Sequence, residues 1–250
     1  MKPRIKPRWN LAPRAAMREQ ERLRERVILA DQFGPIRYVA GADLAFDPAT
    51  DAAVAGVIVY RFPELIEVER RRARRKLRFP YVPGLLSFRE GPALLAAFAR
   101  LRTEPDLILI DGHGRAHPRL FGIASHLGVL LDKPAIGCAK SLLVGEHREP
   151  GRKAGSTASL WFKGERVGEV LRTRDGVKPI YVTAGHRVAL DSAVEFVKQC
   201  CDGFRIPQPT READHYVRDL RRSYQEEQIK GQKAKSKNER RERAAVARAR

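Results

Sequence analysis

Three β-rich runs follow one another early in the chain. They read RYVAGADLAFD, AVAGVIVYRF and LIEVERRRARRKLRF, and only short turn-like segments at residues 48–51 and 62–64 separate them. Parallel strands need a crossover of a dozen or more residues, so connections this short join antiparallel neighbours. The pattern therefore predicts an antiparallel three-strand meander.

The middle of the chain alternates helical and strand patterns. In FREGPALLAAFARL the large apolar residues recur at helical spacing, whereas LILI in LILIDGHG is an unbroken apolar run, typical of a strand buried on both faces. ASHLGVLL and KPAIGCA then complete a strand, helix, strand unit. We therefore expect parallel strands beside the meander, in a mixed α/β sheet flanked by helices.

Both ends of the chain carry charged helical patterns. Residues 16–27, AMREQERLRERV, hold few apolar positions, and we expect a helix with a peripheral role. A second β-rich region, from STASLWF to PIYVTAG, precedes the helical run DSAVEFVKQCC. After the breaker at residues 207–209, Thr210 is a candidate N-cap for a last helix, READHYVRDLRRSYQEEQ.

The hydrophobic pattern stops near residue 228. Residues 229–250 are basic and offer no apolar face, so we expect a disordered tail there and a single domain over residues 1–228. The chain carries 49 Lys and Arg against 30 Asp and Glu, a net charge of +19, and the excess lies in residues 1–26, 69–78 and 221–250. Positive charge gathered in segments indicates a polyanionic partner such as nucleic acid. A general bias toward arginine, with 36 Arg against 13 Lys, is the alternative.

Cysteine and apolar content bear on the compartment. Three cysteines without CxxC or Cys/His finger spacing argue against a disulfide framework or a zinc site. No stretch approaches the roughly 20 apolar residues of a membrane span, and the basic N-terminus has no apolar signal region. We expect a cytoplasmic protein with no membrane contact.

Two aspartates stand at the ends of apolar strands. Asp43 lies in VAGADLAFD, and Asp111 directly follows LILI. A buried carboxylate needs a cation or a hydrogen-bond donor, and hard oxygen ligands suit Mg²⁺ or Mn²⁺. If the two strands are neighbours, both acids reach one end of the sheet. Either aspartate alone could simply cap a turn, but two at separate strand ends favour a metal site.

Glu90 and Lys140 are two further charged candidates. Glu90, at the start of the helix after YVPGLLSFRE, could complete a carboxylate cluster for phosphoryl chemistry, or it could stabilise the helix N-terminus. Lys140 follows the buried run AIGCA and could neutralise a phosphate at the same sheet edge. It could equally mark where that strand meets solvent.

Glycines, histidines and an arginine crowd the segment DGHGRAHPRLFG that starts at Asp111. They are Gly112, His113, Gly114, His117, Arg119 and Gly122. Glycine permits close backbone approach to a ligand, imidazole can relay protons, and an arginine can contact phosphate. An ordinary glycine-rich turn is the alternative, but this density of polar groups beside a buried aspartate favours a site.

Tyr81 lies between Pro80 and Pro83, and the prolines stiffen the loop that presents its ring. A rigid aromatic next to a basic run could stack on bases or wedge between them. The alternative is that Phe79, Tyr81 and Val82 all pack into the core.

These segments together resemble the endonuclease V family of deoxyinosine-specific nucleases, from about Arg37 to about Val217. The matching pieces are VAGADLAFD, PYVPGLLSFRE, LILIDGHGRAHPRLFGIASHLGV, KPAIGCAKSLL, PIYVTAGHRVALDSAV and PQPTREAD. DGHGRAHPR with PYVPG upstream is a highly specific combination. The resemblance implies a ribonuclease H-like fold, in which helices flank a mixed sheet.

The activity that this resemblance implies is DNA repair. Such an endonuclease cleaves at the second phosphodiester bond 3′ to deoxyinosine, which arises when adenine is deaminated. Water activated by Mg²⁺, or by Mn²⁺ in its place, would be the nucleophile, and the products would end in a 3′-hydroxyl and a 5′-phosphate. The partner would be DNA containing deoxyinosine or, in some members, inosine-containing RNA. We expect a monomer.

The resemblance also assigns roles by position. The active-site group would comprise four acids and one lysine: Asp43, Glu90, Asp111, Asp214 and Lys140. Asp43 and Asp111 would bind the metal, and Lys140 would contact a phosphate. In the last helix the family has a further Asp or His, and we choose Asp214 over the adjacent His215 because its spacing from the Thr-Arg pair fits better.

Two more groups of residues are implied to hold the lesion. Tyr81, flanked by Pro80 and Pro83, would be the tip of a wedge that fills the gap left by the displaced base. Three glycines would line the pocket that accepts hypoxanthine. They are Gly84, Gly112 and Gly122.

Two other functions fit the same segments. An inosine-specific ribonuclease would use the same site on RNA. A non-catalytic nucleic-acid-binding protein on the same fold would bind through its basic segments instead. Magnesium-dependent strand cleavage separates the two enzymes from the binding protein.

Overall fold

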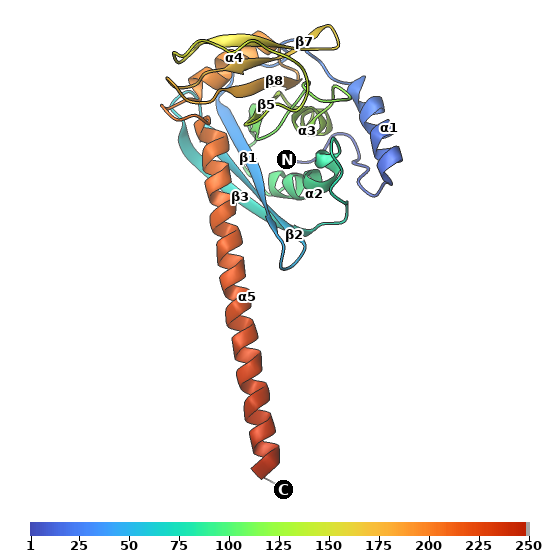
Figure 1. Ribbon diagram of the computed structural model, residues 1–250, viewed down its shortest axis with the longest axis vertical. Coiled ribbons are helices and arrows are strands. Elements are labelled where there is room, and N and C mark those ends of the chain that lie inside the picture. Colours follow the sequence, from blue (N-terminus) through green and yellow to red (C-terminus); the bar gives the residue numbers. More distant parts are fainter. Residues whose placement is uncertain (249–250) are drawn as a thin grey trace.

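One mixed sheet of eight strands forms the centre of the protein, in the order β3-β2-β1-β4-β5-β8-β7-β6 (Figure 1). The computed structural model describes the backbone of residues 1–248 and the side chains of residues 1–230. The strands are β1 (Tyr38–Asp47), β2 (Ala52–Arg61), β3 (Ile66–Lys76), β4 (Leu107–Ile110), β5 (Ala135–Ala139), β6 (Thr157–Phe162), β7 (Glu165–Leu171) and β8 (Ile180–His186). The helices are α1 (Pro13–Arg24), α2 (Leu86–Phe98), α3 (Ile123–Leu131), α4 (Leu190–Gln199) and α5 (Gln208–Arg248).

The first three strands form the predicted antiparallel meander. β1 pairs with β2 over its whole length, and β2 pairs with β3. β4 and β5 then add parallel to β1, and β8, β7 and β6 continue the sheet antiparallel. The predicted fold class, a mixed sheet made of a meander and parallel strands, is therefore confirmed.

Apolar residues cover both faces of this sheet, because successive side chains of a strand point to opposite faces and the central strands are apolar at successive positions. On one face, β1 residues such as Ala40 and Ala42 pack with Leu94 and Phe98 of α2 and with Leu127 of α3. On the opposite face, strand residues pack with α4. In Figure 1, α2 and α5 lie on opposite sides of the meander. Side chains at the sheet ends can therefore meet residues from both helical layers.

Two glycines let α5 lie directly on the meander. A side chain at Gly41 would collide with the backbone of Pro209, and one at Gly56 would come within 2.7 Å of Val217 Cγ1. The prediction that Thr210 is the N-cap of this helix is wrong, because the helix begins at Gln208. Proline fits in a first turn, where its missing N–H is not needed, so Pro209 belongs to the helix instead of preceding it.

The C-terminal segment extends the same helix. The predicted tail at residues 229–250 falls almost wholly outside the side chains that the structure describes, and the division of the chain at residue 228 stays a prediction. Of the helices in the described residues, none combines the length and apolar character needed to cross a membrane.

Candidate active site

The pairing of β1 with β4 brings Asp43 and Asp111 together. Ala42 and Ile110 are partners in the parallel ladder, so the residue that follows each of them stands at the same level of the sheet. The backbone N–H of Asp111 donates to the Ala42 carbonyl at 3.4 Å. The two carboxylates predicted from separate strands therefore meet where β4 ends. The expectation that both stand at strand ends is wrong for Asp43, because β1 continues to Asp47 and pairs with β2 past that point.

Lys140 and Asp214 join this pair from two other elements. Lys140 directly follows β5, and its Nζ forms an ion pair with Asp111 and lies 3.8 Å from Asp214 Oδ2. Asp214 projects from α5 and also pairs with Arg218, one turn further along the helix. The adjacent His215 is 54% exposed and lies beside Glu212 at 3.6 Å. The structure thus places Asp214, and not His215, beside Lys140.

Glu90 reaches the same group from α2 and is 6% exposed. Burial, and then the charges of Asp43 and Asp111, raise the pKa of Glu90 to about 8. Burial and the charge of Asp111 likewise raise the pKa of Asp43 to about 8. Burial alone would lower the pKa of Lys140, but Asp111 and the other acids outweigh it and raise that pKa. One ammonium group therefore does not neutralise the cluster of acids.

The donor chemistry of this cluster suits a hard divalent cation. Carboxylate oxygens are the ligands that Mg²⁺ and Mn²⁺ prefer, and burial together with the neighbouring acids raises the pKa values of Asp43 and Glu90, so a bound cation would favour their charged forms. Within the described residues, no three His, Cys, Asp or Glu side chains are arranged as a metal site. The chemistry of these residues fits the ion.

The loop before α2 presents Tyr81 to solvent. Tyr81 is 71% exposed, whereas Phe79 is buried and stacks against Phe88, with ring centroids 5.5 Å apart. Pro80 and Pro83 are exposed on either side. The alternative in which Tyr81 packs into the core is therefore wrong, because Phe79, with Val82 packed against the same cluster, anchors the loop and leaves the tyrosine ring outside.

Gly84 closes this loop, and its carbonyl accepts three hydrogen bonds. The donors are Gln20 Nε2 at 3.1 Å, His117 Nε2 at 2.9 Å and Arg119 Nη2 at 2.5 Å. The backbone N–H of Arg119 donates to His117 Nδ1, so the ring proton must sit on Nε2. Burial, and then Arg119, lower the pKa of His117 to about 4, so the imidazole is neutral at physiological pH. The histidine therefore ties two loops together as a fixed donor.

Gln20 was missed by reasoning from the sequence. Its side chain is 1% exposed, donates to the carbonyls of Gly84 and Phe121, and accepts from Arg119 Nε at 2.6 Å. The expected peripheral role for the N-terminal helix is wrong, because α1 is tied to the loop that carries Tyr81. The helical spacing of Ala16, Gln20 and Leu23 was the available signal, but a polar residue at a buried position hid it.

Gly112 and Gly122 border the segment after Asp111. Gly112 has a φ of +153°, and a side chain there would approach Ile123 Cγ2 within 2.6 Å. A side chain at Gly122 would collide with the carbonyl of His113. Both positions thus require glycine for packing, and their role in holding a base stays a prediction.

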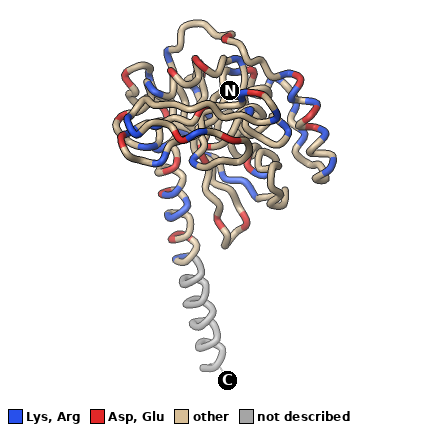
Figure 2. Tube along the Cα trace, turned by 45° about the horizontal axis from the view of Figure 1, so that its top comes forward, with Lys and Arg blue, Asp and Glu red and all other residues tan. Residues whose placement is uncertain are grey.

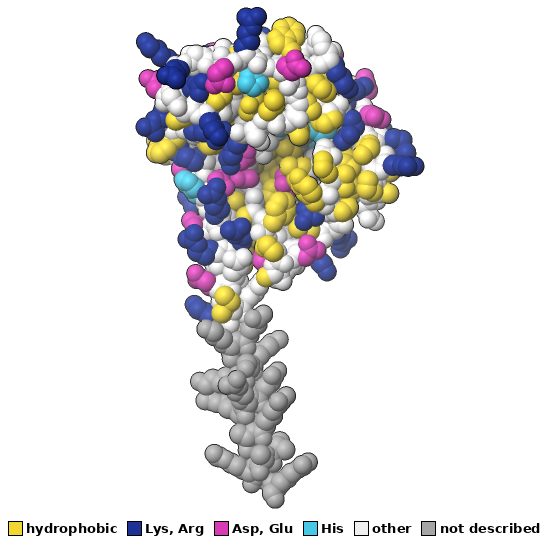
Figure 3. Space-filling view, viewed as in Figure 1, with side chains coloured by type: hydrophobic (Ala, Val, Ile, Leu, Met, Phe, Trp, Pro, Cys, Tyr) yellow, Lys and Arg dark blue, Asp and Glu magenta, His cyan; other side chains and the backbone are white. Residues whose placement is uncertain are grey.

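A hollow surrounds these groups. Figure 3 shows the surface hollowed where the first turns of α5 meet the body, with acidic side chains inside, basic side chains toward α5 and an apolar surface on the other side. A pocket of about 420 Å³ opens beside Lys140, and Arg172, Tyr181 and Arg205 also line it. Arg205 Nη2 donates to the carbonyl of Lys140 at 2.7 Å, which holds this backbone in place.

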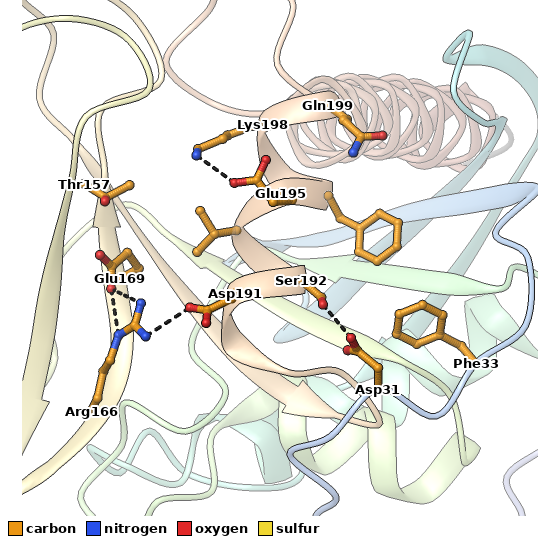
Figure 4. A pocket seen from close by; sticks show the side chains of 12 residues that line it. Asp31, Phe33, Thr157, Arg166, Glu169, Asp191, Ser192, Glu195, Lys198 and Gln199 are labelled. Atoms are coloured by element: carbon orange, nitrogen blue, oxygen red, sulfur yellow. Dashed lines mark hydrogen bonds and ion pairs between the residues drawn. The ribbon is translucent and has the colours of Figure 1, made fainter.

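A larger pocket of about 560 Å³ lies elsewhere, between α4 and strands β6 and β7 (Figure 4). Its charged side chains pair with one another. Arg166 lies between Glu169 at 2.8 Å and Asp191 at 3.0 Å, and Lys198 pairs with Glu195 at 2.8 Å. None of the predicted site residues lines this pocket, so we assign it no part in the activity.

Comparison with known proteins gives a consistent result. The sequence profile described as Endonuclease V matches residues 21–215. An Endonuclease V of Roseiflexus sp. (strain RS-1) is 53% identical over 206 residues, which cover 82% of this chain and 92% of the relative. The crystal structure of the Streptomyces avermitilis Endonuclease V has a TM-score of 0.83 and 42% identity, covering 90% of this chain and 100% of that one.

A third relative was solved with a ligand. The Endonuclease V of Ciona intestinalis, in complex with a 24mer DNA containing an inosine followed by a ribo-adenosine, is 31% identical, with a TM-score of 0.71, and the match covers 83% of this chain and 96% of that one. The fold and the acid cluster beside the end of β4 define an α/β nuclease. More particularly, the chain belongs to the Endonuclease V family.

Proposed function

We propose that this nuclease repairs DNA by cutting the strand at the second phosphodiester bond 3′ to deoxyinosine, leaving a 3′-hydroxyl and a 5′-phosphate. The observation that carries the proposal is the joining of the Tyr81 loop to the segment after Asp111 through the Gly84 carbonyl. A lesion-reading loop and an acid cluster are thereby fixed at one place in the molecule.

In this proposal the acids of the cluster have the roles that the resemblance to the Endonuclease V family implies. Asp43 and Asp111 would hold Mg²⁺, or Mn²⁺ in its place, with Glu90 in the same group and Asp214 as the fourth acid. The ion supplies positive charge at the phosphate and lowers the pKa of water for attack. Lys140 Nζ is 36% exposed and pairs with Asp111, so it can donate to a phosphate oxygen without leaving the cluster.

The wedge would act on the stack of bases. An exposed ring on a proline-stiffened loop can fill the space that an extruded nucleotide leaves, which offsets part of the unstacking energy of a few kcal/mol. Gly84, Gly112 and Gly122 would place backbone groups against the edge of the extruded hypoxanthine, where no side chain intervenes.

The same proposal includes action as a monomer in the cytoplasm. Cys138, Cys200 and Cys201 are free thiols, as is usual in a reducing compartment.

The decisive experiment compares end-labelled duplexes with and without one deoxyinosine, in Mg²⁺ and in EDTA. We expect Mg²⁺-dependent cleavage of the inosine strand at one position, mapped against a sequencing ladder. An inosine-containing RNA is run in parallel. Cleavage of that RNA alone would establish the ribonuclease, and binding without cleavage in any metal would establish the non-catalytic protein.

A further inference from the structure

The outer edge strand β3 carries a dense row of basic side chains. We name it the β3 basic row: Arg70, Arg71, Arg72, Arg74, Arg75, Lys76 and Arg78. The acids of the strand are Glu67 and Glu69. A charge or two suffices to stop an exposed edge from pairing with another sheet. The row therefore carries more charge than edge protection needs.

Alternate members of the row lie over tyrosine rings of α5. The guanidinium carbon of Arg70 is 5.2 Å from the Tyr216 ring centroid, and those of Arg72 and Arg74 are 5.8 Å and 5.0 Å from that of Tyr224. Stacking engages the flat face of a guanidinium, whereas phosphate binds the N–H groups along its edge. The rings thus hold these long side chains extended without using their phosphate-binding groups.

Much of the charge in the row is not neutralised. Arg70 pairs with Glu67, and Arg74 pairs with the buried Asp47 at 2.9 Å. Four members have no carboxylate partner among residues 1–230: Arg72, Arg75, Lys76 and Arg78. Figure 2 shows basic positions also along the part of α5 nearest the body. A polyanion here would meet uncompensated positive charge.

Strand register relates the row to the active site. Asp43 pairs with Gly56, and Gly56 pairs with Arg72, so the side chains of Asp43 and Arg72 point to the same face of the sheet. Two strand spacings put their Cα atoms about 10 Å apart. Val217 of α5 lies over Gly56, between them. The row is therefore separate from the acid cluster yet within reach of the same nucleic acid.

We propose that the β3 basic row binds the sugar–phosphate backbone of duplex DNA flanking the lesion. The row ends at Arg78, three residues before Tyr81, so it leads directly to the wedge. Side chains on one face of a strand recur about every 6.8 Å, which matches the axial rise of two nucleotides of B-DNA. The proposal rests on the proposed function for the identity of the polymer.

The test measures binding to an inosine-free duplex by fluorescence anisotropy over a series of KCl concentrations. The variant combines Arg72→Gln, Lys76→Gln and Arg78→Gln, which are exposed positions outside the ion pairs of the strand. Each lost phosphate contact should reduce the slope of log K against log salt by about 0.9, so the triple variant should lose about 2 to 3 from that slope.

The matched control replaces three exposed basic residues beside β6, with Arg152→Gln, Lys153→Gln and Lys163→Gln. β6 is the edge of the sheet opposite β3 (Figure 1), so the slope should stay at the wild-type value. A charge-keeping variant, Arg72→Lys with Arg78→Lys, should keep the slope, which shows that the triple variant reports lost charge and not misfolding.

Equal slopes for the wild type, the triple variant and the control would overturn the proposal, as would a change seen only with duplex RNA. The measurement involves no cleavage. Failure to cut at inosine would therefore count against the proposed function and leave the binding result intact.

Discussion

His117 donates to the carbonyl of Gly84 over 2.9 Å, which joins the segment after Asp111 to the loop that carries Tyr81. The two bonded residues are 33 positions apart in the chain. A lesion reader and an acid cluster can cooperate only if their separation is fixed, since small misplacements cost large factors in rate. This hydrogen bond and its neighbours fix it.

The acid cluster gives the first prediction. Asp43→Asn or Asp111→Asn should lower the single-turnover cleavage rate at least about 100-fold, because each removes a negative charge that holds the metal. Asp51→Asn, at an exposed turn, is the control and should cleave normally. Wild-type rates in both active-site variants, with folding verified by circular dichroism, would remove these residues from the site.

The wedge gives the second prediction. Tyr81→Ala should reduce discrimination between inosine-containing and undamaged duplexes, because the proposed wedge would contact DNA with this exposed ring where a base is displaced. Affinities for both duplexes in EDTA, where no metal supports cleavage, provide the readout, and Tyr81→Phe should retain the discrimination. An equal loss of affinity for the two duplexes would contradict the wedge role.

Gln20, the buried glutamine of α1, gives the third prediction. Gln20→Met should destabilise the protein by about 1 to 3 kcal/mol, because the Phe121 carbonyl loses its donor in a buried setting. It should also reduce discrimination for inosine in the same direction as Tyr81→Ala. Thermal melting and the paired affinities measure the two effects, with the exposed Gln32→Met as the control. A loss of stability with unchanged discrimination would show a purely structural role.

The raised pKa values of Asp43 and Glu90 give the fourth prediction. In EDTA, Asp43 and Glu90 keep their protons in the folded protein up to about pH 8, whereas in the unfolded chain they lose them near pH 4. The folded state therefore holds more protons between these values, and the free energy of unfolding must fall as pH rises through this window.

Melting temperatures measured between about pH 5 and about pH 8 test this expectation. The double variant Asp43→Asn, Glu90→Gln should show a flatter profile. Adding Mg²⁺ near pH 8 should raise the melting temperature of the wild type and leave that of the double variant unchanged. Identical pH profiles for the two proteins in EDTA would refute the link between these acids and stability.

The acid pair was predictable from the sequence because Asp43 and Asp111 each interrupt an apolar run, which is a local signal. The end of the strand was predicted correctly for Asp111 only, since the pairing of β1 with β2 carries that strand past Asp43. The exposure of the Tyr81 ring was predictable from a local signal too, since Pro80 and Pro83, which stiffen its loop, are close to it in the chain.

Other parts of the site depend on contacts distant in sequence. Gln20 meets Gly84 across 64 residues and Phe121 across 101, and its helical spacing from Ala16 and Leu23 does not tell which partners it meets. The choice of Asp214 over His215 rested on spacing from a family pattern, and the orientation of α5 on the sheet decides which of the two faces Lys140. That orientation depends on Gly41 and Gly56, because a side chain at either position would collide with α5.

The packing of α5 against Gly41 and Gly56 has a consequence for the synthesis of the protein. The ribosome releases β1 before α5, and all eight strands precede α5 in the chain. Asp214 cannot approach Lys140 until α5 has been made and has docked on the sheet. The order of translation thus delays the assembly of the full acid cluster until after the sheet has been synthesised.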